Sequence, residues 1–473
     1  MPTPMPTPPS PGPAPLVVAI EMGLGHLRAA DTLARALGVP LLHVDRAPLA
    51  GDAERRRWAR SRRFYETVSR LSQRPLAGAP LRGVLSALTH IPHLHPQRDL
   101  SRPSLTLRFL EAQVARGLGA GLVAALARDG APLLTTFFAP ALIADRLGQG
   151  PVHCLVTDAD IARVWVPSHP DRTRIHYFAP TERALRRLTA YGVPAAQIQL
   201  TGFPLPDELV GGPSLPRLRA NLAARLERLD PAGVFRDQHR EELAHFLGPL
   251  PGRPPQAPML TFAVGGAGAQ ADLARQFMPS LRSEIEAGRL RLTLLAGVRR
   301  SVADAFTALV ARTGLAGHPG VRVAFADAPP SNGVPPGGAR AGVEAPADAL
   351  DAYFRTCNAV LAETDILWTK PSEMTFYGAL GLPLLFSWPV GAQERYNRRW
   401  AIESGAGLKQ RDPRFAGEWI AEWLASGTLA SAAWSGFMRL PKFGLYRILQ
   451  SFGVDAAGAT TARAPTRLTP PLS

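Results

Sequence analysis

The segment Gly23-Leu24-Gly25-His26 lies between an apolar run and a helical pattern, and its residue types could do chemistry. Glycine lets the backbone approach a ligand closely, and the free N–H groups at a helix start favour an anion or a polarised hydroxyl. An imidazole placed there can act as a general base, which makes His26 a candidate catalytic residue. A dinucleotide-binding turn would need a third glycine where Arg28 stands. The competing interpretation is a histidine that only caps a tight turn.

A second glycine-rich turn follows the apolar run 259–264. Its small residues predict a phosphate cradle, because the N–H groups of the turn and of the first helical turn would point at a pyrophosphate. The candidate donor-binding residues are Gly265, Gly266, Ala267, Gly268, Ala269 and Gln270. A Walker loop is excluded, since no Gly-Lys-Ser/Thr follows. A tight turn that only needs small residues is the alternative.

A third stretch places polar side chains at a predicted strand-to-helix turn, where they would face the crevice at the carboxyl end of a sheet. Its candidates are Thr369, Lys370, Ser372 and Glu373. Glu373 could accept hydrogen bonds from a ribose diol, or it could simply be a favourable charge at a helix N-terminus. Lys370 would add positive charge near a diphosphate.

Asp158 follows another apolar run, 152–156, and is a second candidate for the base. An aspartate directly after a buried strand often serves only as a helix or turn cap, and this alternative stays open.

Alternating strand and helix patterns must position these residues. Apolar runs of strand length lie at 16–20, 41–44, 132–138, 152–156, 175–178 and 198–200, and again at 259–264, 292–295, 321–325, 360–361 and 384–386. Strands separated by helical stretches predict an α/β fold, with two Rossmann-like doubly wound parallel-sheet domains facing a cleft. The expected organisation is a disordered Pro-rich leader (1–15), an N-terminal domain (16–210), a Pro-rich linker (211–258), a C-terminal domain (259–440), and a closing helix with a disordered tail (441–473).

Together these motifs resemble the GT-B glycosyltransferases. The resemblance rests on Gly-Leu-Gly-His at 23–26, Gly-Gly-Ala-Gly-Ala-Gln at 265–270, Thr-Lys-Pro-Ser-Glu at 369–373, Gly-Leu-Pro at 381–383 and Gln-Glu at 393–394. Within that fold the chain is most similar to the group of monogalactosyldiacylglycerol synthase and the peptidoglycan lipid N-acetylglucosaminyltransferase. The similarity spans about 16–210 and 259–410.

The resemblance implies a metal-independent, usually inverting transfer of a sugar from a nucleotide diphosphate donor, held by the C-terminal half, to an acceptor held by the N-terminal half. No separate cofactor is implied, because the nucleotide-sugar is itself a substrate. By position, Gly23, Gly25 and His26 would lie on the acceptor side, and Gln393 with Glu394 would contact the sugar. One residue departs from the pattern: the ribose-binding Glu of that group falls on Phe376, and the nearest carboxylate is Glu373.

The net charge of +15 is mainly arginine-rich coding, since only three of the 53 basic residues are lysine. One segment, 46–82, nevertheless holds ten Arg against three acidic residues. Its helical stretch 53–73 predicts a face for an anionic membrane surface, and a solvated arginine-rich face is the alternative. The residues predicted to face the membrane are Arg55, Arg56, Trp58, Arg62, Arg63 and Tyr65.

The composition excludes several classes of protein. Two cysteines in 473 residues exclude a disulfide scaffold, and neither has metal-ligand spacing. No apolar run reaches membrane-spanning length, which predicts a cytoplasmic protein. The arginine-rich segment and the resemblance together imply that it could lie on the inner face of the plasma membrane. No nucleic-acid-binding motif is visible, so no nucleic-acid partner is expected. A UDP-sugar 2-epimerase-like enzyme and a non-catalytic nucleotide-binding scaffold on the same fold remain the competing functions.

Overall fold

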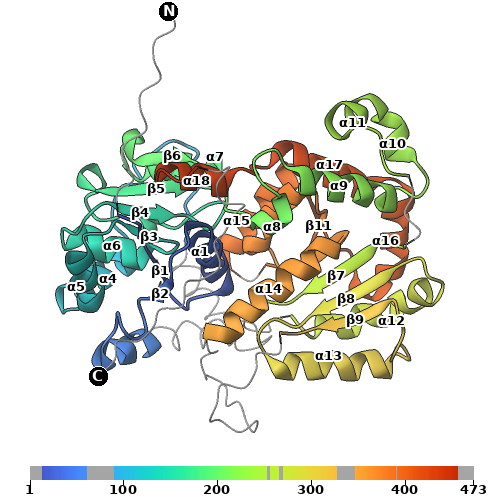
Figure 1. Ribbon diagram of the computed structural model, residues 1–473, viewed down its shortest axis with the longest axis horizontal. Coiled ribbons are helices and arrows are strands. Elements are labelled where there is room, and N and C mark those ends of the chain that lie inside the picture. Colours follow the sequence, from blue (N-terminus) through green and yellow to red (C-terminus); the bar gives the residue numbers. More distant parts are fainter. Residues whose placement is uncertain are drawn as a thin grey trace, which may run out of the picture.

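The computed structural model describes residues 13–60, 90–252, 256–265, 270–326, 347–389 and 391–455. These residues form two parallel six-stranded sheets flanked by helices, arranged side by side (Figure 1). The predicted fold class, an α/β protein of two doubly wound parallel sheets, is confirmed.

The first sheet has the strand order β2-β1-β3-β4-β5-β6, and neighbouring strands pair in parallel. Its strands are β1 (Leu16–Ala19), β2 (Leu41–His43), β3 (Leu133–Thr135), β4 (Val152–Leu155), β5 (Ile175–Ala179) and β6 (Ile198–Leu200). The helices of this half are α1 (Leu24–Leu37), residues 52–60, α4 (Leu105–Ala115), α5 (Ala120–Asp129), α6 (Phe138–Arg146), η1 (Arg163–Trp165), η2 (Pro170–Arg172), α7 (Glu182–Ala190), η3 (Ala195–Gln197) and α8 (Asp207–Val210).

The second sheet has the order β12-β11-β10-β7-β8-β9 and is also parallel. Its strands are β7 (Met259–Ala263), β8 (Arg291–Leu295), β9 (Val321–Ala324), β10 (Ile366–Thr369), β11 (Leu384–Phe386) and β12 (Gly407–Lys409). Its helices are α12 (Leu273–Glu286), α13 (Arg300–Arg312), α14 (Ala347–Glu363), η4 (Glu373–Leu380), α15 (Ala392–Glu403), η5 (Pro413–Phe415), α16 (Ala416–Ala425) and α17 (Thr428–Arg439). The central strands are apolar and buried along their length, as strands covered on both faces must be.

Both sheets have a topological switch point, where the strand order reverses. In the first sheet it lies between β1 and β3, and in the second between β7 and β10. Ligands of open α/β sheets bind outside the carboxyl ends of the strands at such points. The turn that carries His26 follows β1, the Gly265 turn follows β7, and Lys370 directly follows β10. The topology therefore puts all three motifs where this architecture binds ligands.

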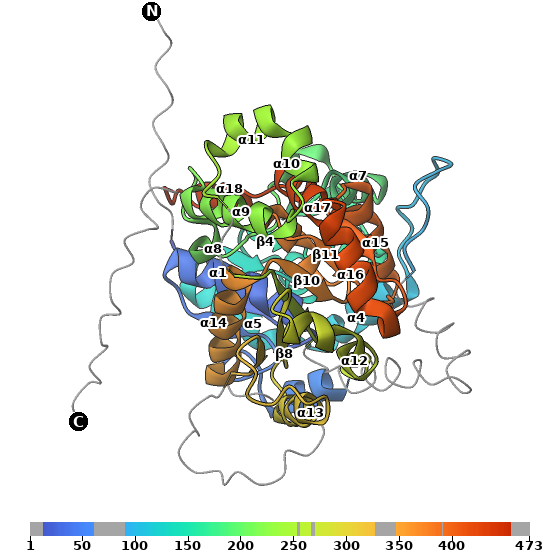
Figure 2. The same cartoon turned by 90° about the vertical axis from the view of Figure 1, so that its right-hand side faces the viewer.

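The segment that we predicted as a linker is mostly helical and packs on the second half. It forms α9 (Pro216–Leu229), α10 (Val234–Gln238) and α11 (Arg240–Leu247), and α9 and α10 contact α17 (Figure 2). The buried Arg225 donates to the carbonyls of Thr364 (3.0 Å) and Leu380 (2.7 Å). Arg228 forms two hydrogen bonds, of 2.7 and 2.8 Å, to Asp365. These contacts make the segment part of the second half.

The chain returns to the first half at its end. The predicted closing helix is α18 (Gly444–Ser451), which contacts α1 and lies at the edge strand β6, where the hydroxyl of Ser451 donates to the side chain of Gln199 (3.1 Å) (Figure 1). Phe452 packs edge-on against His153 at 4.8 Å between ring centroids. One continuous core joins α1 to the second half, and within it Phe203 stacks on Phe376 at 4.6 Å.

Several predictions about local structure differ from the observed elements. Residues 360–361, read as a strand, lie in the last turn of α14, whose buried face is equally apolar. The strand that actually precedes Lys370 is β10. The strand β12 was also missed, because its sequence Gly-Leu-Lys contains no apolar run. Of the predicted leader only residues 13–15 are described, and Pro15 is buried directly before β1. The predicted surface loop at 328–346 and the tail beyond residue 455 lie outside the described residues.

No single helix of the described chain is long and apolar enough to cross a membrane. One bent pair, α4 with α5, passes that test by length and composition, with 68° between the two helices.

Candidate functional site

His26 lies in the first turn of α1, where the backbone leaves β1 through a glycine turn. Its Nδ1 is 2.9 Å from the carbonyl oxygen of Thr136 and 2.7 Å from the hydroxyl of Thr157. A carbonyl can only accept, so this geometry assigns the proton to Nδ1 and leaves a lone pair on Nε2. No described residue hydrogen-bonds to Nε2. This is the tautomer that a general base requires.

The surroundings of His26 favour the neutral imidazole. Burial lowers its pKa to about 4, opposed by the hydrogen bond to Thr136 and by the charge of Glu373. Phe137 packs edge-on against the ring at 4.6 Å, and the centroid of Trp165 lies 6.1 Å away. His26 is therefore unprotonated at neutral pH and able to accept a proton.

Asp158 lies in the loop after β4, next to Thr157. Its pKa is raised to about 6, mainly by burial and further by the negative charges of Glu373 and Glu394. The hydrogen bond from Asn397 and the positive charge of Lys370 oppose this increase. Two candidate bases, His26 and Asp158, thus sit at one place with pKa values about two units apart.

Asn397, a residue that the sequence analysis missed, connects the two halves at Asp158. Its side-chain N–H groups donate to Asp158 (2.9 Å) and to the carbonyl of Pro371 (3.3 Å), and its oxygen accepts from the backbone N–H of Ala159 (2.7 Å). Asn397 lies on α15, one helical turn after Gln393 and Glu394. That spacing on a helix already suspected of donor contact was the signal available in the sequence.

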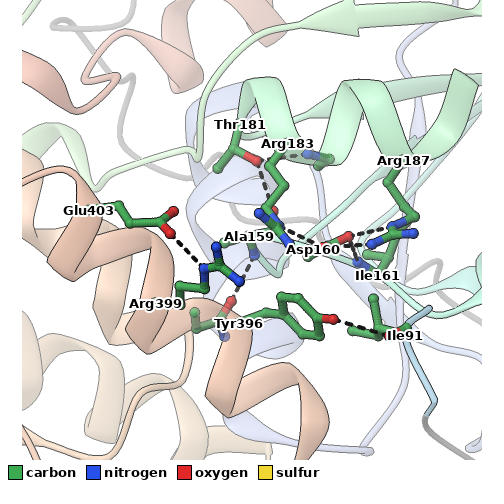
Figure 3. A network of polar contacts seen from close by, with 12 residues as sticks. Ile91, Ala159, Asp160, Ile161, Thr181, Arg183, Arg187, Tyr396, Arg399 and Glu403 are labelled. Atoms are coloured by element: carbon green, nitrogen blue, oxygen red, sulfur yellow. Dashed lines mark hydrogen bonds and ion pairs between the residues drawn. The ribbon is translucent and has the colours of Figure 1, made fainter. Parts of the chain in front are cut away.

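The loop that carries Asp158 is also fixed from its other side (Figure 3). The fully buried Asp160 accepts hydrogen bonds from Arg187 (2.8 and 3.0 Å) and Arg183 (2.7 Å) of α7. The guanidinium of Arg183 lies over the ring of Tyr396 from α15, 4.9 Å from its centroid. This double attachment fixes the backbone at Asp158.

Glu373 begins η4, and its side chain lies against the glycine turn of the first half. A Cβ added at Gly25 would come within 2.8 Å of a carboxylate oxygen and 3.0 Å of the Cβ of Glu373, so only glycine allows this approach. Its ion-pair partner is Arg28, with 3.9 Å between Nε and the nearer oxygen. No described residue donates a hydrogen bond to this carboxylate, which is 12% exposed.

Phe376, on which the ribose-binding Glu of the resembling group falls, is buried between Phe203 and Trp400. It belongs to the core, and the carboxylate that lies at the junction is Glu373.

The predicted donor residues lie around the end of β10. Lys370 bonds to Glu394 (2.9 Å), and its Cε would lie 2.9 Å from a Cβ added at Gly265. Gln270 has a left-handed backbone (φ 69°), donates to the carbonyl of Trp388 (2.7 Å) and accepts from Ser387. The remaining described residues of this group behave differently: Thr369 is buried and bonds to the carbonyl of Ala263, Ser372 is the N-cap of η4, and Gln393 lies in the first turn of α15. Gly266, Ala267, Gly268 and Ala269 lie outside the described residues.

Trp388, which the sequence analysis also missed, follows β11 and is 69% exposed. The guanidinium of Arg398 lies over its ring, 5.8 Å from the centroid. An exposed tryptophan bonded through its carbonyl to Gln270 is an aromatic platform beside the second glycine turn.

The residues predicted to face a membrane differ in their exposure. Arg55 and Arg56 are exposed, and Arg55 pairs with Asp52. The prediction for Trp58 is wrong, because its side chain is 8% exposed and packs in the core of the first half. The side of the helix that carries Trp58 faces the core, because burying the apolar surface of the ring is more favourable than leaving it exposed to water. Arg62, Arg63 and Tyr65 lie outside the described residues.

A cavity of about 280 Å³ opens in the first half beside η1. Its lining includes Asp99, Arg102, Arg163 and Tyr191. Arg163 and Trp165 belong to the same short helix, η1, and the ring of Trp165 lies near His26. Within the described ranges, no cluster of three or more His, Cys, Asp or Glu side chains could hold a metal ion.

Comparison with known proteins adds little about this site. The model of a family described as a domain of unknown function (DUF6938) matches residues 255–447. Solved structures similar to the chain include MurG of Acinetobacter baumannii (11% identity, 92% of this chain and 98% of that one, TM-score 0.44), the glycosyltransferase SnogD of Streptomyces nogalater (14%, 92% and 98%, 0.41) and the UDP-GlcNAc 2-epimerase of Methanocaldococcus jannaschii (12%, 92% and 99%, 0.36). None of the curated proteins matches the chain. These likenesses say nothing of the roles of His26, Asp158 or Glu373.

Proposed function

We propose that the protein is a glycosyltransferase that moves a sugar from a nucleoside diphosphate donor, a UDP-sugar, to a hydroxyl acceptor. One observation carries the proposal. Two side chains, an imidazole and a carboxylate, meet where the switch points of two parallel sheets adjoin, and no residue that the structure describes hydrogen-bonds to Nε2 of the first or to the oxygens of the second. The first can accept a proton, and the second can accept the hydroxyls of a ribose.

The reaction needs one proton transfer and one leaving group. The acceptor oxygen attacks the anomeric carbon, the bond from that carbon to the diphosphate breaks, and UDP leaves with the bonding electrons. The acceptor proton passes to Nε2 of His26, or to Asp158 in the alternative arrangement. The turn that begins at Gly265 is proposed to hold the departing diphosphate, together with the ammonium of Lys370. The chemistry proposed here is metal-independent, and inversion at the anomeric carbon is expected from a single displacement.

The test screens a panel of UDP-sugars against a total lipid extract, with UDP release and product mass as readouts. His26→Ala should reduce turnover by roughly 10²- to 10⁴-fold, the usual contribution of a general base. His153→Ala is the matched control, because His153 also has its pKa lowered to about 4 by burial but packs against His176 and Phe452. Unchanged turnover in His26→Ala would remove His26 from the chemistry.

A membrane-facing first half would give the enzyme a lipid acceptor. Leu105 (81% exposed) and Phe109 (63% exposed) lie one turn apart on α4. The helix 52–60 adjoins α4, since Arg57 donates to the carbonyl of Arg116 (3.1 Å), and it brings the exposed Arg55. Apolar side chains beside arginines fit an anionic lipid surface.

Sedimentation with phosphatidylglycerol vesicles tests this surface. Leu105→Glu combined with Phe109→Glu should release the protein, whereas Phe415→Glu, at an apolar site on the second half that is 51% exposed, should not. Absence of binding at low salt would refute the membrane proposal.

A second candidate function, a UDP-sugar 2-epimerase-like enzyme, is favoured by one observation. The charges of Glu373 and Glu394 both act on Asp158 and raise its pKa, so that acidic side chains lie on both sides of the junction. An epimerase would incorporate solvent deuterium at the sugar C2 without any acceptor, and a transferase would not.

A non-catalytic scaffold is the remaining alternative. It would bind UDP yet release none from any UDP-sugar in the panel.

A further inference from the structure

Arg28 crosses from the first half into the second. It lies on α1, two residues after His26, yet its side chain is 2% exposed and is enclosed by residues of α14 and η4. The rings of Tyr353, Phe354 and Tyr377 surround the guanidinium at 5.5 to 5.6 Å from their centroids. The cage fixes the position of the cation by cation–π contacts.

The bonding of Arg28 is unlike that of a structural arginine. The buried Arg225 donates to three backbone carbonyls, and the buried Arg187 forms a two-bonded pair with Asp160. Arg28 donates a long hydrogen bond of 3.4 Å to the hydroxyl of Tyr353, and within the described part of the chain its Nε and Nη1 form no well-made hydrogen bond. Burying a cation with its donors open is costly, so packing alone does not explain this residue.

The carboxylate that Arg28 faces is Glu373. The separation of 3.9 Å is too long for a hydrogen bond but short enough for an electrostatic attraction between the two charges. A direct two-bonded pair would occupy the lone pairs of the carboxylate. The longer separation orients Glu373 against Gly25 while leaving its oxygens open toward the junction.

We propose that Arg28 is a positioning residue for Glu373, contributed by the acceptor-side half to the donor site. The inference rests on the proposed function, in which the carboxylate of Glu373 accepts the ribose hydroxyls of the nucleoside diphosphate. Arg28 itself touches no ligand and acts only through Glu373.

The test measures the binding of two probes, UDP and 2′,3′-dideoxy-UDP, by calorimetry. A carboxylate that accepts ribose hydroxyls should give the unmodified protein a preference for UDP of roughly tenfold or more, because hydrogen bonds to charged groups are strong. Arg28→Met should remove most of this preference while retaining affinity for the dideoxy probe. Arg28→Lys, which keeps the charge, should restore part of it.

Two further variants separate positioning from general damage. In a Glu373→Gln background, Arg28→Met should change the ribose preference no further, because both substitutions remove the same contact. Arg35→Met is the matched control, since Arg35 also extends from α1 to α14, pairing with Asp351, but is 41% exposed. It should keep the preference.

The binding results distinguish failure of the proposed function from failure of the role of Arg28. An unmodified protein that binds neither probe overturns the proposed function and this inference with it. A protein that prefers UDP, but whose preference survives Arg28→Met or falls additively with Glu373→Gln, overturns the role of Arg28 alone. If Arg28→Met does not fold, Arg28→Lys measured alone and with Glu373→Gln gives the same decision.

Discussion

Replacing Asp158 by Asn should stabilise the folded protein at neutral pH while impairing any reaction that uses its carboxylate. Burial raises the pKa of Asp158 from an ordinary 3.8 to about 6 in the folded chain. The folded state therefore disfavours the ionised form by about 3 kcal/mol, at 1.36 kcal/mol for each pKa unit. Asp158 is not wholly buried, so we expect a gain of roughly 1 to 3 kcal/mol in the free energy of unfolding.

The size of this effect depends on pH within a defined window, and its sign stays the same throughout. Below pH 3.8 the carboxyl is protonated in both states, and Asp and Asn differ little. As pH rises from 3.8 to about 6 the unfolded chain ionises while the folded chain resists, so stability is lost over this range. The advantage of Asp158→Asn should be complete above pH 6 and should vanish near pH 4. An amide can still accept the hydrogen bond from Asn397.

Thermal unfolding at pH 4 and pH 7.5 provides the assay, with Asp160→Asn as the control. Asp160 lies two residues away but is paired with Arg187 and Arg183, and breaking a buried pair costs about 3 to 5 kcal/mol. The two substitutions should thus have opposite signs at pH 7.5. A melting temperature lowered by Asp158→Asn at pH 7.5, or a gain equally large at pH 4, would refute the reasoning.

Three further predictions concern the proposed donor site and base. If His26 is the base, kcat/KM for UDP release should fall with an apparent pKa near 4, and roughly nine tenths of the full rate should remain at pH 5. If Asp158 is the base, the apparent pKa should be near 6, and roughly one tenth should remain at pH 5. An apparent pKa that is the same in His26→Ala and in Asp158→Asn would exclude both residues. Trp388→Ala should weaken UDP binding by roughly tenfold, the scale of one base-stacking contact, without changing the melting temperature. The control Phe415→Ala should change neither quantity, and an unaltered dissociation constant in Trp388→Ala would remove Trp388 from the donor site. Phe376→Ala should cost about 3 to 5 kcal/mol in unfolding free energy, as expected of a buried ring stacked on Phe203, and a stability loss below 1 kcal/mol would contradict its place in the core.

Local signals in the sequence predicted the fold well. The apolar runs that became β1 and β7 are each followed by a glycine turn, and parallel strands buried on both faces need such continuous runs. The same signal failed at residues 360–361, because the buried face of an amphipathic helix also shows short apolar runs. In the segment predicted as a linker, one charged helical stretch at 218–229 was predicted and is confirmed as α9, but α10 and α11 were missed among eight prolines. Packing of α9 and α10 on α17 stabilises this segment.

The site could be predicted only in part, for a different reason. The positions of His26 and Asp158 follow from local rules about strand ends. The contacts of Arg28 and Asn397 join residues more than 230 positions apart, and no periodicity in one sequence encodes such pairs. Trp58 shows the converse limit, because an aromatic residue amid arginines fits a membrane face or a core equally well until its neighbours are known.

Each half orients a carboxylate of the other half at the proposed site. Arg28 of the first half faces Glu373 of the second, and Asn397 of the second half bonds to Asp158 of the first. Each carboxylate is therefore oriented by the opposite half. The amide of Asn397 has both of its N–H donors and its oxygen in use, so it holds Asp158 only while Pro371 and Ala159 keep their present places. Any movement that separates the halves disorders both carboxylates together, and the proposed donor and base sites should form or dissolve as one unit.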